Sequence, residues 1–212
     1  MIYLYTAALA VVSYLIGSIN SSILISKAVT GKDIRQSGSG NAGATNMLRT
    51  MGKKYAVITL IIDILKGVAA ILLSKLAVSL GAPMWCSYVA GVCVVLGHNF
   101  PIFFGFKGGI GVATSLGVVL LLDWRIGVTV LVVALLIMVL TRYVSLGSVT
   151  AAVVFMALQI ADMIITGEFN AVRLVCVLVL GFLLIIRHHA NISRLLKGTE
   201  NKLGGKKKEE TV

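Results

Sequence analysis

Residues 110–141 read IGVATSLGVVLLLDWRIGVTVLVVALLIMVLT, and only Asp123 and Arg125 in this stretch carry a charge. A helix needs roughly 20 apolar residues to cross the ~30 Å hydrocarbon core of a bilayer, so the stretch is too long for one crossing. The interruption Asp123-Trp124-Arg125 predicts two helices, 110–122 and 125–141, of which the first is short. Such a pair of apolar helices is typical of an integral membrane protein.

The rest of the chain has the same character. It is 58% hydrophobic and 13% charged, whereas a soluble domain carries about 25% charged residues. Five further stretches are long enough to cross a bilayer: 3–26, 54–79, 84–104, 146–166 and 170–186. We therefore predict an all-α, polytopic bundle of seven transmembrane helices in one domain, 1–203, followed by a short charged cytoplasmic tail, 204–212. Five helices are the alternative if 110–141 is re-entrant.

The charges between the apolar stretches predict the orientation of the bundle. If the N-terminus lies outside, nearly all lysines and arginines fall in cytoplasmic segments, and only Lys75, Arg125 and Arg173 lie toward the other side. This asymmetry is the positive-inside rule. We expect an external N-terminus and a cytoplasmic C-terminus.

Composition also excludes several classes of protein. The net charge of +11 lies mostly in loops between apolar stretches, which argues against nucleic-acid binding. The first cation, Lys27, follows the first apolar stretch, whereas a secretory signal carries its charge before it. The three cysteines lie in apolar stretches without metal spacing, which indicates buried, reduced thiols.

Two charges lie within a predicted span. Asp63 and Lys66 are three residues apart, so they share one helix face. Charges inside a membrane normally face the bundle interior and pair with each other. A self-neutralising pair that orients the helix is the simpler interpretation, and a role in substrate binding is the alternative.

Three polar stretches stand out in this apolar chain. They are 38–49 (GSGNAGATNMLR), 97–114 (GHNFPIFFGFKGGIGVAT) and 187–202 (RHHANISRLLKGTENK). The predicted topology places all three on the cytoplasmic side, together with the turn 142–148. We expect them to form one site.

The first polar stretch has the residues of an anion site. It contains GxGxxG at 38–43, but no predicted strand precedes it, which argues against a dinucleotide-binding fold. Neutral donors are available from four side chains: Ser39, Asn41, Thr45 and Asn46. Arg49 can bind a phosphate through two parallel hydrogen bonds. The alternative is a helix cap at the membrane surface.

The second stretch runs Lys107-Gly108-Gly109-Ile110-Gly111 into a helix. A glycine-rich turn before a helix presents free N–H groups and the positive end of the helix dipole, which favours anion binding. It is not a Walker loop, because GxxxxGK[ST] is absent. Glycines that allow close helix packing are the alternative interpretation.

The third stretch places His188 and Asn191 three residues apart, so both can face one site. No metal site is expected, because His98 is the only histidine elsewhere and no cysteine cluster is present. Anion-binding groups beside an apolar interior indicate a phosphate-bearing substrate that meets a lipid-like one. An acyl or lipid transferase fits this pattern, and so does an anion transporter.

These three stretches closely resemble the signatures of the PlsY family, the acyl-phosphate-dependent glycerol-3-phosphate acyltransferases of the bacterial cytoplasmic membrane. The resemblance runs nearly end to end and includes Gly17-Ser18 and Asp63-x-x-Lys66-Gly67. It implies transfer of an acyl group from acyl phosphate to glycerol 3-phosphate, which gives lysophosphatidic acid for phospholipid synthesis. It also implies no cofactor, a surrounding of membrane lipids and an active site on the cytoplasmic side.

The resemblance further implies roles for individual residues. Ser39 and Arg49 belong to the essential set, and the glycines Gly108, Gly109 and Gly111 form the glycerol-phosphate loop. Ser148, His188 and Asn191 complete the phosphate pocket, and Glu200 is structural. From its place in the basic, glycine-rich second stretch, we also expect Lys107 to contact a phosphate.

Two positions depart from the family pattern. The first helix has Ile19-Asn20 where the family has a proline shortly after Gly-Ser. The second motif has Ile110 where the family has a second lysine, and Lys107 is the residue that could compensate. We expect weaker binding of glycerol phosphate rather than an inactive protein.

The chemistry needs little beyond positioning and charge neutralisation, because phosphate is a good leaving group. The sequence shows no serine–histidine–carboxylate set, so we expect no acyl-enzyme and assign Ser39 as a hydrogen-bonding ligand. The general base is either His188 or an oxygen of the substrate phosphate, which would make catalysis substrate-assisted. A transporter or channel for a phosphate-bearing solute and a lipid-binding scaffold remain alternatives, and oligomeric state and acyl-chain preference stay open.

Overall fold

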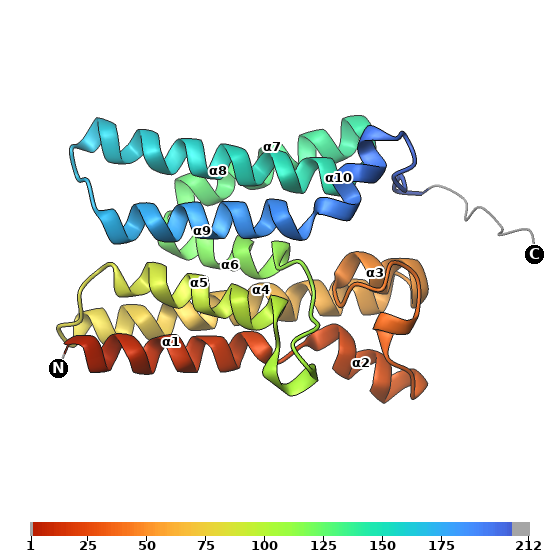
Figure 1. The fold of residues 1–212 in the computed structure, drawn as a ribbon, viewed down its shortest axis with the longest axis horizontal. Helices are drawn as coiled ribbons and strands as arrows, with labels where there is room; N and C mark the ends of the chain where they lie inside the picture. Colours follow the sequence, from red (N-terminus) through yellow and green to blue (C-terminus); the bar gives the residue numbers. More distant parts are fainter. Residues whose placement is uncertain (1, 205–212) are drawn as a thin grey trace, which may run out of the picture.

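The computed structural model describes residues 2–204, and this part of the chain contains helices and loops but no strand (Figure 1). The elements, in chain order, are α1 (Ile2–Ser18), α2 (Ser21–Thr30), the 3₁₀ helix η1 (Ile34–Gln36), α3 (Ala44–Thr50), α4 (Lys53–Ser79), α5 (Cys86–Asn99), the 3₁₀ helix η2 (Ile102–Phe104), α6 (Val112–Leu122), α7 (Trp124–Thr141), α8 (Val144–Thr166), α9 (Ala171–Arg187) and α10 (His189–Leu196). The all-α prediction is confirmed. The predicted tail falls almost wholly outside the described residues.

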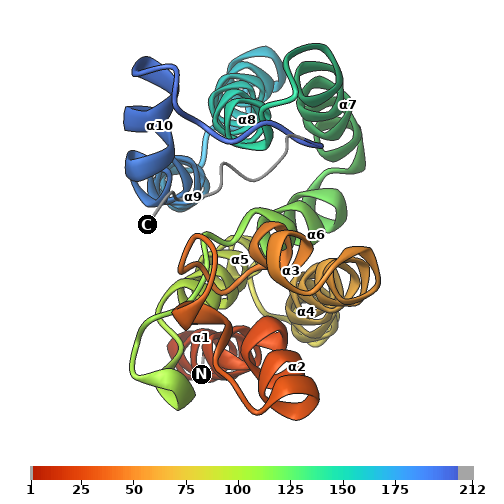
Figure 2. The same ribbon diagram turned by 90° about the vertical axis from the view of Figure 1, so that its right-hand side faces the viewer.

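The helices form two groups with α6 between them (Figures 1 and 2). In one group α1 packs on α5, and α4 packs on α5 and α6; in the other α8 packs on both α7 and α9. α6 contacts α4 on one side and α7 on the other, and α9 contacts α5 across the groups. Close approach of α4 and α6 requires glycine, because a Cβ on Gly117 would lie 2.2 Å from the carbonyl oxygen of Ile64.

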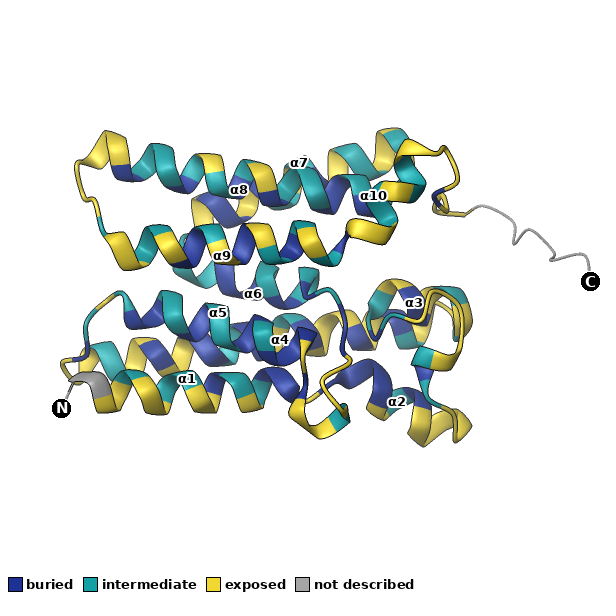
Figure 3. Cartoon of the chain, viewed as in Figure 1, coloured by how far each residue is buried: buried dark blue, intermediate teal, exposed yellow. Residues whose placement is uncertain are grey.

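Length and composition identify the membrane spans. Five helices are long and apolar enough to cross a bilayer, and a sixth is obtained if α9 and α10, bent by 56°, count as one span. Large apolar side chains on these helices are exposed, as at Leu76, Leu140 and Ile165 (Figure 3). Such exposure is expected where a helix faces lipid rather than water. The chain is a multi-pass membrane protein.

The stretch 110–141 is divided where the sequence predicts. Asp123 ends α6 and caps α7, because its Oδ1 accepts hydrogen bonds from the N–H groups of Arg125 at 2.9 Å and Ile126 at 3.2 Å. α6 has 11 residues and is therefore about 16 Å long. It covers only about half of a hydrocarbon core of ~30 Å.

The first apolar stretch forms one candidate span, Leu4–Thr30, as predicted for 3–26, but its helix is interrupted within the span rather than continuous. The helix breaks after Ser18, and Asn20 caps α2 by accepting a hydrogen bond from Ile23 N at 3.2 Å. Lys66 in α4 donates to the carbonyl oxygens of Gly17 and Ile19 at the break. The break is stabilised because these carbonyls find a charged donor inside the bundle.

One end of the bundle gathers the polar segments. The loop before α3, the loop 100–111 and α10 lie toward the same end, opposite the start of α1 (Figure 1). Segments far apart in the sequence are neighbours there, as the hydrogen bond from Leu203 N to Arg142 O illustrates. This end contains all three polar stretches.

Candidate active site

A cavity of about 700 Å³ opens between the two helix groups at this end. Its polar lining includes nine of the residues predicted from the sequence: Ser39, Asn41, Thr45, Asn46, Arg49, Gly111, Ser148, His188 and Asn191. Three predicted residues, Lys107, Gly108 and Gly109, are not part of the lining. The three polar stretches thus contribute to one site, as expected.

The loop that carries Ser39 is held by Asn46. The Nδ2 group of Asn46 donates to the carbonyl oxygens of Ile34 and Ser37, and its Oδ1 accepts from Ser39 N at 2.8 Å. Both amide protons are used inside the loop. Asn46 therefore braces the loop in this structure and has no proton left to donate to an anion.

Several donors of the first stretch remain unused. The side chains of Ser39, Asn41, Thr45 and Arg49 line the cavity and make no hydrogen bond with the described residues. Arg49 is half-buried, and burial lowers the pKa of its guanidinium. A partly desolvated cation beside three free neutral donors favours an anion in the cavity.

The glycine loop has a different local structure from the one predicted. The N–H groups of Gly108 and Gly109 donate to the carbonyl oxygens of Asn99 and His98, so they are not free for an anion. Gly109 is required for packing, because a Cβ there would lie 2.4 Å from Ala42 O and 2.3 Å from His98 Nε2. The backbone hydrogen bonds of these two glycines hold the loop against the end of α5.

Two arginines hold this loop from either side. Arg187 donates to the carbonyl oxygens of Gly108 and Gly109, the latter at 2.8 Å. Arg35 donates to the carbonyl oxygens of Phe104 and Lys107, both at 2.8 Å. Asp33 fixes the guanidinium of Arg35 through two hydrogen bonds, and this contact lowers the pKa of Asp33 to about 2. The loop is held in place by Arg35, which precedes the first polar stretch, and by Arg187 of the third.

The start of α6 reaches the cavity. Ile110, Gly111, Val112 and Ala113 line it, and the first N–H groups of a helix have no acceptor within that helix. The positive end of this helix therefore faces the polar part of the cavity. The side chain at position 110 is part of the lining, so isoleucine places an apolar group where a lysine would place a cation.

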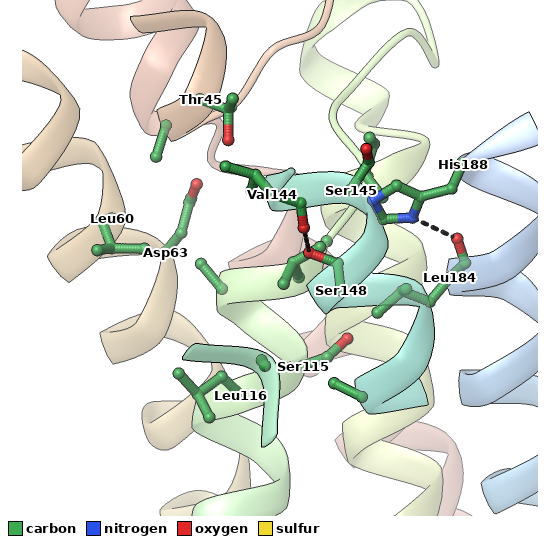
Figure 4. A pocket seen from close by; sticks show the side chains of 18 of the residues that line it. Thr45, Leu60, Asp63, Ser115, Leu116, Val144, Ser145, Ser148, Leu184 and His188 are labelled. Atoms are coloured by element: carbon green, nitrogen blue, oxygen red, sulfur yellow. Dashed lines mark hydrogen bonds between the residues drawn. The ribbon is translucent and has the colours of Figure 1, made fainter. Parts of the chain in front are cut away.

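His188 presents an acceptor to the cavity. Its Nδ1 lies 2.9 Å from the carbonyl oxygen of Leu184, and Figure 4 shows the ring beside Ser145 and Ser148. A carbonyl oxygen can only accept, so Nδ1 carries a proton, and in the neutral ring Nε2 keeps a lone pair. His188 is buried, with 3% of its surface exposed. Its free nitrogen is suited to receive a proton.

Glu200 orients Asn191 so that it too presents an acceptor. The Nδ2 group of Asn191 donates to Oε1 of Glu200 at 2.8 Å, and Ser145 donates to the same oxygen at 3.0 Å. Arg194 donates to Oε2 at 2.6 Å, which neutralises the carboxylate. Because a carboxylate cannot donate, Oδ1 of Asn191 is left to face other groups as an acceptor.

The hydroxyl of Ser148 also lines the cavity (Figure 4). It donates to the carbonyl oxygen of Val144 at 2.9 Å. The hydroxyl would have to leave this bond before it could donate to a phosphate. In this structure it adds another acceptor on the side of His188.

The buried pair Asp63–Lys66 is formed as predicted, with 3.0 Å between Nζ and Oδ1. Sequence reasoning missed that His98 joins it, since its Nδ1 lies 2.7 Å from Lys66 Nζ. Asp63 and His98 both line the cavity, whereas Lys66 does not. No spacing in the sequence connects α4 with His98 in α5, so only packing shows this contact.

The other end of the cavity is apolar and lies within the bundle. Its lining comes from five helices and includes Leu60, Leu116, Val130, Phe155 and Leu180. Val130, Phe155 and Leu180 also belong to the buried hydrophobic core. One continuous space therefore joins a polar end to an apolar end.

Comparison with known proteins agrees with this architecture. Residues 7–198 match the family model described as glycerol-3-phosphate acyltransferase. The chain is 44% identical to a glycerol-3-phosphate acyltransferase of Clostridioides difficile over 94% of this chain and 96% of the relative. It is 46% identical to glycerol-3-phosphate acyltransferase 1 of Deinococcus radiodurans over 95% and 98% of the two chains.

Two solved structures have the same fold. The crystal structure of PlsY, an integral membrane glycerol 3-phosphate acyltransferase, in its glycerol 3-phosphate form matches with a TM-score of 0.84 and 40% identity. The match covers 94% of this chain and 96% of that one. The lysophosphatidic acid form matches with a TM-score of 0.79 and 38% identity, over the same shares of the two chains. This protein therefore belongs to the glycerol-3-phosphate acyltransferase family of integral membrane enzymes.

Proposed function

We propose that this protein transfers the acyl group of an acyl phosphate to the 1-hydroxyl of glycerol 3-phosphate. The products are lysophosphatidic acid and inorganic phosphate. The observation that carries the proposal is the single cavity that joins unused polar donors, such as Arg49, to an apolar end at Phe155. The PlsY structures in glycerol 3-phosphate and lysophosphatidic acid forms support this acceptor and this product.

A direct transfer without an acyl-enzyme is supported by the surroundings of Ser39. Its hydroxyl has no hydrogen-bond partner among the described residues, so no base activates it as a nucleophile. An acyl phosphate is already activated, because its phosphate leaves readily. Ser39 and Thr45 act as neutral donors, and Arg49 neutralises charge on a phosphate.

The acceptor hydroxyl is placed by the acceptors on the other side of the cavity. It donates toward Nε2 of His188 and Oδ1 of Asn191, which the bonds to Leu184 and Glu200 leave free. The hydroxyl oxygen forms a bond to the acyl carbonyl carbon, and the bond from that carbon to the phosphate oxygen breaks. The electron pair leaves with phosphate, and His188 takes the hydroxyl proton and returns it to the departing phosphate.

We also propose that the polar end lies on the cytoplasmic side of a bacterial cytoplasmic membrane, with seven crossings and an external N-terminus. The positive-inside distribution of charge supports this orientation. α6 is the short crossing, completed by the loop 100–111 that is held against α5. Glycerol 3-phosphate would reach the cavity from the cytoplasm and the acyl phosphate from the bilayer.

Acyl transfer by purified protein in detergent tests the function. The assay supplies palmitoyl phosphate and labelled glycerol 3-phosphate, with palmitoyl-CoA as a parallel donor. We expect labelled lysophosphatidic acid from palmitoyl phosphate alone, and release of inorganic phosphate only when glycerol 3-phosphate is present. Product from palmitoyl-CoA alone would reject the acyl-phosphate donor.

A transporter of a phosphate-bearing solute is distinguished in sealed vesicles. Reconstituted transporter would move labelled glycerol 3-phosphate across the bilayer unchanged, without any acyl donor. We expect no such uptake by this protein. Uptake without conversion would replace the proposed function.

A further inference from the structure

Four charged side chains, histidines aside, line the cavity: Arg49, Lys53, Asp63 and Glu200. Both carboxylates are already neutralised by groups outside the cavity lining. Asp63 is paired with Lys66 at 3.0 Å, and Glu200 with Arg194 at 2.6 Å. The cavity therefore keeps the positive charge of Arg49 and Lys53 unpaired.

Neither cation is in direct contact with a carboxylate. The side chains of Arg49 and Lys53 make no hydrogen bond or ion pair with any residue that the structure describes, although Glu200 acts on Arg49 electrostatically. Arg49 is half-buried in α3, and Lys53 is exposed at the first residue of α4. One cation is thus deeper in the site, and the other stands at its mouth.

The proposed reaction brings two phosphate groups into one site, which favours two cations there. Both substrates, acyl phosphate and glycerol 3-phosphate, carry a phosphate group, and each such group is bound most strongly by charge-assisted hydrogen bonds. The second polar stretch does not provide the second cation. Ile110 is apolar, and Lys107 lies outside the lining, with its carbonyl oxygen bound by Arg35.

We propose that Lys53 is a substrate-binding residue that holds the phosphate of glycerol 3-phosphate at the mouth of the cavity. This inference rests on the proposed function. Glycerol 3-phosphate is the water-soluble substrate, so its phosphate lies toward the exposed cation, while Arg49 is left for the acyl phosphate nearer the apolar end. The site takes a phosphomonoester of a small polyol on one side and a lipid-like phosphate on the other.

The next residue along the chain is a matched control. Lys54 also stands in the first turn of α4, but its Nζ lies 5.8 Å from the centre of the Tyr55 ring and it is not part of the lining. Both lysines contribute equally to the positive charge at the membrane surface. Of the two lysines, only Lys53 lines the cavity and can contact a substrate there.

The experiment compares steady-state kinetics of Lys53→Met, Lys53→Arg and Lys54→Met with wild type. We expect Lys53→Met to raise KM for glycerol 3-phosphate about tenfold or more, which is the loss of one charge-assisted contact. We expect kcat and KM for palmitoyl phosphate to stay within about threefold, and Lys53→Arg to restore most of the affinity. We expect Lys54→Met to resemble wild type.

Three outcomes would overturn the inference. They are an unchanged KM in Lys53→Met, an equal rise in both methionine variants, or a rise in KM for palmitoyl phosphate instead. Calorimetric titration of each purified protein with glycerol 3-phosphate measures the same contact without turnover. A wild type that binds glycerol 3-phosphate through Lys53 but transfers no acyl group would reject the proposed function and retain the inference.

Discussion

The amide of Asn191 donates to the carboxylate of Glu200 over 2.8 Å, and this bond decides which atom of Asn191 is left free at the cavity. Because Glu200 can only accept, Asn191 presents its oxygen rather than its NH₂ group. The carboxylate is buried, with 7% of its surface exposed, and is shared with Ser145 and Arg194. Glu200 thus orients Asn191 and links it to Ser145 and Arg194.

An exchange of the amide and carboxylate groups between positions 191 and 200 tests this orientation. We expect Asn191→Asp to lower kcat about tenfold or more, because two carboxylates then face each other. Glu200→Gln lowers kcat less, since a glutamine amide can still accept from Asn191. In the double variant Asn191→Asp/Glu200→Gln, the glutamine NH₂ donates to the aspartate, so kcat recovers relative to Asn191→Asp. A double variant no better than the worse single one, with the same melting temperature as wild type, would contradict the orientation.

Replacement of His188 by glutamine tests the general base. Glutamine keeps hydrogen-bonding capacity near Leu184 O but cannot take up the proton. We expect kcat to fall by about 10²-fold, with KM for glycerol 3-phosphate within about threefold of wild type. The decline of kcat at low pH, which protonation of an imidazole base causes, should disappear. A rise in KM with an unchanged pH profile would instead assign His188 to substrate binding and leave the base to the substrate phosphate.

Position 110 tests the charge of the cavity directly. Ile110 lines the cavity beside Gly111, at the positive end of α6. We expect Ile110→Lys to lower KM for glycerol 3-phosphate about tenfold, since one charge-assisted contact is gained. The gain should be larger in a Lys53→Met background, where the cavity otherwise keeps only one unpaired cation. No change, or a loss of turnover, would reject this interpretation; Ile110→Met controls for repacking.

The contact of Arg35 with the glycine loop tests how the loop is held. Arg35→Ala removes hydrogen bonds to Phe104 O and Lys107 O, and we expect the free energy of unfolding to fall by about 2 kcal/mol. We expect Arg35→Lys to restore only part of this, because an ammonium lacks the guanidinium fork. Thermal unfolding in detergent measures both. A stability equal to wild type in Arg35→Ala would show that Arg187 alone holds the loop.

The pH dependence of the same contact follows from Asp33. Its pKa is lowered to about 2 by the hydrogen bond from Arg35, below the usual value of 3.8. A lowered pKa in the folded state stabilises the protein above pH ~4, and this contribution is lost as pH falls toward 2. We therefore expect Asp33→Asn to lower the melting temperature equally at pH 5 and pH 8. A difference that disappears at pH 5 would contradict the assignment.

Interactions within one helix or one short segment explain several features of this fold. The sequence alone determines the apolar helices, because a span requires length and low charge, and it places the division of 110–141 at Asp123, whose side chain caps the next helix. It also predicts the Asp63–Lys66 pair, since residues three apart share a helix face. The residue types of the three polar stretches likewise predict that they carry the site. In each case the physical cause acts within one helix or one short segment.

Only the tertiary structure decided which polar groups remain free. Lys53 lines the cavity while Lys107 does not, and the N–H groups of Gly108 and Gly109 are taken by α5. The acceptor character of His188 and Asn191 likewise depends on the partners behind them, Leu184 and Glu200. A side chain's direction and its remaining hydrogen-bonding capacity depend on contacts between segments distant in sequence, because each donor or acceptor used in packing is lost to a substrate. The sequence therefore determined the chemistry available to this protein, and the packing of its helices decided where that chemistry is offered.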